Sequence, residues 1–158
     1  VGEILLAFLI ECMSTFRFTR IVSILFILVL INFSNAEVNS IHIESQLDPN
    51  AIIITQVDII FVYAQELIDS FPATKTAWYS NQRQFIADAG DRIDIRSVFI
   101  PQGFNSETAS LPERGAEALK IFIFAEHDTS TAAPIDITDF NDVLVTIDEF
   151  GIVVTRQD

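Results

Sequence analysis

The stretch SQLDPNAIIITQVDIIFVYAQEL, residues 45–67, decides the fold of this chain. It opens with the turn LDPNA at 47–51 and continues as an apolar segment, in which residues 57–64 are apolar at seven of eight positions. A run that is rich in Val and Ile and bounded by turn residues is typical of a strand buried on both faces. Such a strand lies in the middle of a sheet, and other layers must cover it.

Shorter segments around this strand alternate apolar and polar residues, which is the period of a half-buried strand. Before it, Ile41, Ile43 and Leu47 share one face. The strands expected after it are a half-buried one at 93–100, a weak one at 104–111, a second central one at 118–125, and a closing pair at 141–148 and 152–156. The closing pair is joined by the hairpin turn DEFG at 148–151.

Residues 65–90 change to the helical period. We expect one helical turn at 65–69 and a longer helix at 75–89, with Thr74 as its N-cap and Gly90 as its terminator. The apolar face of this helix, which we expect to lie over an end or edge of the sheet, contains Trp78, Gln82, Phe85, Ile86 and Ala89. The predicted fold is therefore mainly β, a two-layer β-sandwich of about seven strands with one inserted helix around 75–89.

Residues 13–36 have the pattern of a targeting segment. Arg17 and Arg20 follow Met13, an apolar run covers 21–31, and small residues at 34–36 precede Glu37. The run of about 11–13 residues is shorter than the roughly 20 that span a bilayer as a helix. We predict a cleaved secretory signal peptide, with an uncleaved N-terminal anchor as the alternative, followed by a single domain at 37–158. Residues 1–12 precede a plausible start methionine, so translation is expected to begin after them.

The only cysteine, Cys12, lies before this segment and follows Glu11, which argues against lipid attachment there. The chain from Glu37 onward then has neither a disulfide nor a thiol, and core burial alone must stabilise it. Its formal net charge of −13 comes from acids dispersed over residues 37–158. This charge would repel nucleic acid and anionic lipid surfaces, and it is typical of a solvated, soluble surface.

No combination of residues predicts catalysis, a cofactor or a metal site. The two histidines are His42, on the polar face of a strand, and His127, in an EHD triplet that we interpret as a solvated loop. Asp136, Asp139 and Asp142 lack the glycine and the terminal glutamate of a calcium loop. No nucleophile elbow, phosphate loop or pair of zinc ligands is present in the sequence. We therefore expect a protein without enzymatic activity.

The order of several short motifs resembles a known family. The motifs are LDPNA at 47–51, IIFVYAQEL at 59–67, SVFIPQG at 97–103, Leu111-Pro112, an apolar strand at 119–125 and a hairpin at 144–155. In this order they are similar to TssJ, the outer-membrane lipoprotein family of type VI secretion systems. The resemblance implies a transthyretin-like β-sandwich without catalytic activity. It also implies a periplasmic docking subunit that is tethered to the outer membrane and binds the periplasmic end of a large inner-membrane partner.

The resemblance further implies that the loop between the first two strands holds the partner. We therefore predict a partner-binding segment of Asp48, Pro49, Asn50, Ala51 and Ile52, extending toward Gln56. Loops at the end of a sandwich vary without disturbing the core, and apolar residues beside a proline turn are candidates for exposure. The alternative is that residues 52–54 simply begin the central strand.

Two functions remain open on the sequence. The first is a docking subunit of a secretion assembly, located in the periplasm or associated with the outer membrane. The family carries an acylated cysteine at the signal-peptide junction, but this junction reads SNAE at 34–37, so we expect no lipid on the mature chain. The second is an exported sandwich module of a pilus, adhesin or surface assembly that binds another protein through a sheet edge.

Overall fold

The computed structural model describes residues 36–50 and 54–157. All of the predicted signal peptide or anchor except Ala36 lies outside the described residues, as do the partner-binding candidates Ala51 and Ile52. All described residues belong to one compact unit.

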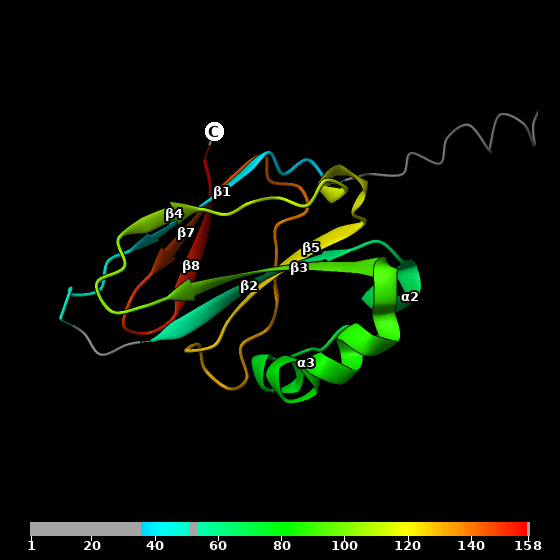
Figure 1. Cartoon of the computed structure of the whole chain (residues 1–158), viewed down its shortest axis with the longest axis horizontal. Helices are drawn as coiled ribbons and strands as arrows, with labels where there is room; N and C mark the ends of the chain where they lie inside the picture. Colours follow the sequence, from blue (N-terminus) through cyan, green and yellow to red (C-terminus); the bar gives the residue numbers. More distant parts are fainter. Residues whose placement is uncertain (1–35, 51–53, 158) are drawn as a thin grey trace, which may run out of the picture. The chain divides into compact units, whose positions relative to one another are not determined.

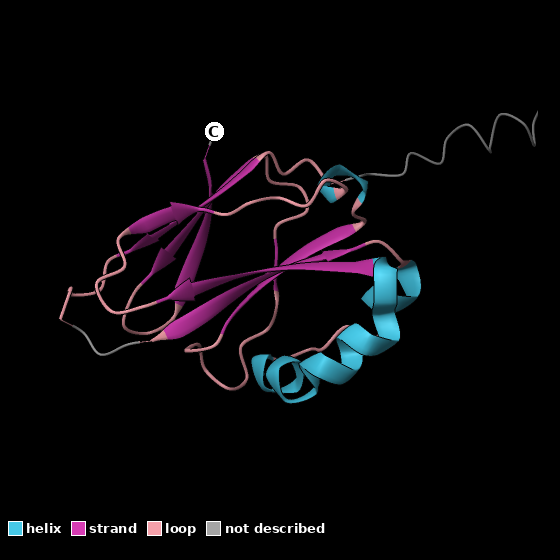
Figure 2. Ribbon diagram, in the orientation of Figure 1, coloured by secondary structure: helices cyan, strands magenta, loops and turns pink. Residues whose placement is uncertain are grey.

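Two four-stranded sheets form this unit, as Figures 1 and 2 show. The first sheet has the order β4-β1-β7-β8, and the second has the order β3-β2-β5-β6. The strands of the first sheet are β1 (Ser40–Ser45), β4 (Ser106–Thr108), β7 (Asp142–Ile147) and β8 (Ile152–Gln157). The strands of the second sheet are β2 (Thr55–Val62), β3 (Ile93–Ile100), β5 (Lys120–Ala125) and β6 (Ile135–Asp136). The predicted two-layer β-sandwich is confirmed.

The central strand of the sequence prediction is β2, which pairs antiparallel with β3 on one side and β5 on the other. Its register sets Ile59 opposite Ile123 and Phe61 opposite Ile121. As expected for a strand covered on both faces, seven of its eight residues are buried. In β5, every residue after Lys120 is buried as well. The two strands predicted to be central are therefore the most buried in the structure.

The first sheet buries one face only. Within it, β1 runs parallel to β7, and β7 and β8 form the predicted hairpin. Ile41 and Ile43 of β1 are fully buried, as are Val145 and Ile147 of β7, in agreement with their alternation in the sequence. These side chains pack in one core with the inner face of β2 and β5. Because alternate side chains of β1 and β7 are buried, one face of the first sheet packs on the inner face of the second.

Two helices cover the outer face of the second sheet. α2 (Gln65–Asp69) and α3 (Lys75–Ala89) follow β2, and α3 has the predicted bounds. The Thr74 hydroxyl accepts a hydrogen bond from the Ala77 N–H at 3.2 Å, and Gly90 ends the helix with a φ of 60°. Both terminal signals were predicted from the sequence.

The position of α3 on the sheet differs from the prediction. Trp78 is fully buried in a second apolar cluster with Ile60, Val62, Phe122 and Phe124. These residues lie on the face of β2 and β5, so the helix covers the face of the sheet rather than an end or edge. The reason is that both central strands are apolar on both faces, and the outer face needs a cover.

Two short strands also differ from the sequence prediction. The weak strand expected at 104–111 is shortened to β4 (Ser106–Thr108), because the Phe104 N–H closes a turn with the Pro101 carbonyl at 3.1 Å. The two-residue strand β6 (Ile135–Asp136) lies in a segment that was expected to be loop up to Pro134 and was not predicted as a strand. A strand of two residues is too short to show a period in the sequence.

Candidate docking surface

The turn between β1 and β2 is exposed at Asp48, Pro49 and Asn50. The Asp48 carboxylate accepts hydrogen bonds from the backbone N–H of Asn50 at 2.7 Å and from its side-chain amide at 3.1 Å. An Asp side chain that accepts from the backbone N–H two residues further on closes a local turn of this kind. Three of the five predicted partner-binding residues are thus present in one solvent-facing turn.

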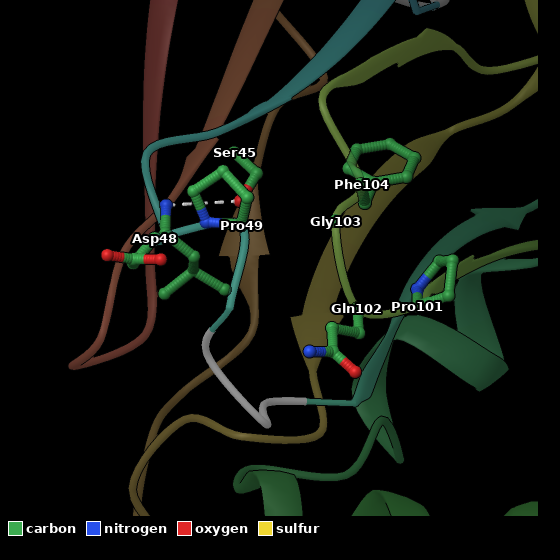
Figure 3. Close-up of a pocket in the computed structure, with 8 residues that line it drawn as sticks. Ser45, Asp48, Pro49, Pro101, Gln102, Gly103 and Phe104 are labelled. Atoms are coloured by element: carbon green, nitrogen blue, oxygen red, sulfur yellow. Dashed lines mark hydrogen bonds between the residues drawn. The ribbon is translucent and has the colours of Figure 1, made fainter.

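A second turn borders the first. Residues 101–104 follow β3, and Gly103 adopts a φ of 75°, a conformation that glycine tolerates and other residues rarely adopt. A Cβ atom added to Gly103 would lie 3.9 Å from the Pro49 carbonyl oxygen, so the two turns nearly touch. Figure 3 shows them facing each other across a small pocket. The pocket is lined by Ser45, Leu47, Asp48, Pro49, Pro101, Gln102, Gly103 and Phe104.

The backbone fixes where the first turn leaves the sheet. The Ser45 N–H donates to the Asn105 carbonyl at 2.8 Å, and the Gln46 N–H donates to the Ile147 carbonyl at 2.9 Å. Leu47 and Phe104 pack against the core from beneath the pocket. The rim of the pocket is therefore polar and exposed. Where the turn leaves β1, hydrogen bonds attach it to the segment before β4 and to the end of β7, its two neighbours in the first sheet.

The β7–β8 hairpin lies at the same end of the sandwich, because β1 and β7 run parallel and end together. His127 joins this hairpin to the second sheet. One ring nitrogen lies 3.1 Å from the Thr55 hydroxyl, and the other lies 3.0 Å from the Gly151 carbonyl oxygen. His127 lies in a turn outside the strands, as expected, but its ring is half-buried rather than solvated. Its half-buried ring bridges two layers, and this could not be read from its acidic neighbours in the sequence.

Large apolar side chains are exposed at this end. Ile54, just before β2, is 61% exposed, Phe99 near the end of β3 is 60% exposed, and Phe150 in the hairpin turn is 78% exposed. We predicted exposure somewhere in residues 51–54, and Ile54 is the member that the structure describes. Phe99 and Phe150 were missed. The alternation of side chains along β3 could have predicted the exposure of Phe99. Its neighbours Val98 and Ile100 are buried on one face of the sheet, so Phe99 points to the other face.

The acids at this end are not paired with basic side chains. Asp48, Glu126 and Glu149 are exposed, and none of them belongs to an ion pair among the described residues. Asp128 lies beneath the hairpin and accepts a hydrogen bond from the Ile152 N–H at 3.0 Å. Burial raises the pKa of the Asp128 carboxyl above its ordinary value, against the opposing effect of that hydrogen bond and of nearby His127 and Lys75. The end of the sandwich therefore combines negative charge with exposed apolar groups.

The described part of the chain shows neither a cluster of metal ligands nor a membrane-spanning helix. Over residues 36–50 and 54–157, no three His, Cys, Asp or Glu side chains converge in a way that could hold an ion. In the same part of the chain, the helices are too short or too polar to cross a bilayer.

Comparison with solved structures finds similar chains from type VI secretion systems. One is Lip of Serratia marcescens, described as a membrane-bound component of that system. It aligns with a TM-score of 0.45 and 11% identity over 78% of this chain and 99% of its own. Another is the lipoprotein TssJ1 of Pseudomonas aeruginosa, with a TM-score of 0.49 and 10% identity over 75% of this chain and 95% of its own. No family model and no curated protein matches the sequence.

Proposed function

We propose that this protein is a non-enzymatic, exported docking subunit of a cell-envelope secretion assembly. One observation carries the proposal. Two of the motifs that resemble TssJ, LDPNA at 47–51 and SVFIPQG at 97–103, are far apart in the sequence, yet their turns border the same pocket. The pairing of β2 with β3 brings these two turns together and places both motifs on one exposed rim, where a partner can reach them.

The partner that we propose is the periplasmic part of a large inner-membrane subunit of the same assembly. The proposed contact is the turn at Asp48, Pro49 and Asn50, continuing through Ala51 and Ile52. The turn supports this role because its own hydrogen bonds hold it in one conformation, which lowers the entropy lost on binding. The negative charge of the surface disfavours nucleic acid and anionic lipid as alternatives.

We further propose that the mature chain begins at Glu37 and carries no lipid, and that the protein resides in the periplasm or at the outer membrane. The small residues at 34–36 before Glu37 support this cleavage point. Cleavage there costs the folded unit one contact, since the buried Ala36 donates from its N–H to the Ala118 carbonyl at 3.0 Å. Intact mass of the exported protein tests the proposal. A mass that includes residues 13–36, or an added diacylglycerol group, would contradict it.

A second candidate function is an exported module that binds another protein by adding a strand. It is favoured by β3, which pairs only with β2 among the described strands and so leaves one edge open. The neighbouring genes distinguish the two candidates. Genes for a contractile sheath and a large inner-membrane subunit support the secretion assembly, whereas pilus or adhesin genes support the second candidate.

If the neighbouring genes include a large inner-membrane subunit, the purified periplasmic domain of that subunit tests the docking role. Asp48→Ala and Asn50→Ala should each weaken its binding by about tenfold, as expected for central contacts of an interface. Glu113→Ala is the matched control, since Glu113 is exposed in a different segment and its loss changes the charge as Asp48→Ala does. Unchanged binding by both turn variants, with a normal thermal melt, would overturn the proposed contact.

A further inference from the structure

The tip of the β7–β8 hairpin holds a phenylalanine in solvent. Phe150 is 78% exposed, the largest exposure among the large apolar side chains described in the structure. Exposed aromatic rings on a flexible loop need no explanation, because a loop can fold them back onto the protein. The backbone around Phe150 does not have this freedom, for the reasons that follow.

Hydrogen bonds fix the turn that carries Phe150. The Asp148 carboxylate accepts from the N–H of Phe150 at 2.8 Å and from the N–H of Gly151 at 3.0 Å. The Asp148 N–H in turn donates to the Gly151 carbonyl at 3.0 Å. Gly151 also packs so closely on Asp128 that a Cβ atom there would lie 2.0 Å from the Asp128 Oδ1 atom. The hairpin tip is therefore held by its own hydrogen bonds, and it packs directly against the segment that contains Asp128.

That neighbour is fixed as well. Lys75, in the first turn of α3, donates from its Nζ atom to the backbone carbonyls of Glu126 and Asp128. The Glu126 N–H donates to the Gln56 carbonyl of β2 at 2.9 Å. The segment beneath the hairpin is thus attached to both the helix and the sheet. Phe150 is presented on a preorganised support, and preorganisation lowers the cost of binding.

The surroundings of Phe150 indicate which surface would accept it. Glu149 precedes it, and Glu126 is exposed on the adjacent segment that Asp128 and His127 connect to the hairpin. Lys75 is committed to backbone carbonyls rather than to these carboxylates. An apolar centre with an acidic rim complements an apolar pocket with a rim of Lys or Arg.

We propose that the hairpin tip, Phe150 with Glu149, is a second docking point for the same protein partner, inserted into an apolar pocket that basic side chains surround. This inference rests on the proposed function and extends it from the β1–β2 turn to the adjacent hairpin. A second copy of this chain fits less well, because two acidic tips repel each other. An anionic membrane surface repels them for the same reason.

The test measures binding of the same purified periplasmic domain to full-length variants. Phe150→Ser should raise the Kd at least tenfold, as expected for a buried aromatic anchor. Val153→Ser, on the same hairpin and 51% exposed, is the matched control and should change the Kd less than twofold. Glu149→Lys should slow association, with a larger effect at low salt than at high salt.

The possible results distinguish a failure of the hairpin inference from a failure of the proposed docking role. If Phe150→Ser binds like the wild type while Asp48→Ala does not, the hairpin inference is overturned and the docking role stands. If the wild type does not bind the domain at all, both are overturned. If light scattering shows a dimer that Phe150→Ser dissociates, the occupant is a second copy and the inference is again overturned.

Discussion

The two ends of the sandwich differ in whether their charged side chains form ion pairs. At the end that carries α2, three basic side chains form ion pairs: Arg92 binds Glu66 at 2.9 Å, Arg114 binds Glu117 at 3.2 Å, and Lys120 binds Asp136 at 2.6 Å. At the end that carries the β1–β2 turn and the β7–β8 hairpin, no such pair occurs among the described residues. There the exposed acids stand beside exposed apolar side chains.

Aromatic side chains show the same contrast. Tyr63 at the first end lies beneath the Arg114 guanidinium, 4.4 Å from its ring centre, and donates from its hydroxyl to Asp94 at 2.9 Å. Burial, together with the bond to Asp94, raises the pKa of the Tyr63 hydroxyl. Phe150 at the other end has no comparable cover. The α2 end thus pairs several of its charged and aromatic groups within the fold, whereas the hairpin end has no ion pair among the described residues and exposes apolar side chains, as we expect of the proposed docking surface.

The largest expected effect comes from comparing a phenylalanine that packs inside the fold with one that is exposed at the hairpin end. Phe61 lies in the core of β2 and is 1% exposed, whereas Phe99 lies on β3 and is 60% exposed. Phe61→Ala should cost about 3–5 kcal/mol in the free energy of unfolding, because it removes a large buried side chain and leaves a cavity. Phe99→Ala should cost less than about 0.5 kcal/mol. Chemical denaturation measures both, and equal losses would contradict this contrast.

A second test concerns Asp58, the single polar residue in the central run. Its carboxylate is fully buried between sheet and helix and accepts four hydrogen bonds, from Gln56 at 2.7 Å, Trp78 at 2.9 Å, Gln82 at 2.9 Å and Ser97 at 2.6 Å. Asp58→Ala should cost about 3 kcal/mol in the free energy of unfolding, since it leaves these donors without an acceptor. Asp58→Asn should cost less, because an amide oxygen still accepts. A loss below about 0.5 kcal/mol in Asp58→Ala would show that α3 does not depend on this carboxylate.

The smallest expected effect is a pH dependence at the paired end. Burial alone would raise the pKa of the Asp136 carboxyl, but the hydrogen bonds from Lys120 and Thr138 outweigh it and hold that pKa below its ordinary value of 3.8. Because the folded pKa is the lower one, the stabilisation is complete above pH 3.8 and is lost as the pH falls through the folded value.

Asp136→Asn should therefore lower the free energy of unfolding at pH 7, and the difference from the wild type should disappear on acidification below pH 3.8. Glu113→Gln, an exposed change at a residue that forms no ion pair among the described residues, is the control. A difference at Asp136 that stays constant with pH would show that the carboxylate is not stabilised by its partners.

The sequence predicted what depends on repetition along the chain. The long apolar runs of β2 and β5, the alternation in β1 and β7, and the caps Thr74 and Gly90 each provide several residues or a specific side chain as a signal. β6 consists of two residues, and β4 is shortened by a turn, so neither has a period to read.

The candidate site was less predictable because it depends on contacts between distant segments. The turn at 48–50 was predicted from its residues and from a resemblance. Its neighbour, the turn at 101–104, begins 51 residues after Asn50, and only the pairing of β2 with β3 brings the two together. The roles of Asp58, His127 and Phe150 likewise depend on tertiary neighbours, and nothing in the adjacent sequence indicates them.

The measurement that tests the central claim most directly is backbone hydrogen exchange, with and without the purified periplasmic domain. If the partner binds the end with unpaired charges, protection should increase at residues 46–50, 99–104 and 148–151. It should stay unchanged at residues 63–69 and 112–117 of the opposite end. Exchange reports local protection segment by segment, so the two ends serve as each other's control. Protection confined to residues 63–69 and 112–117 would contradict the account.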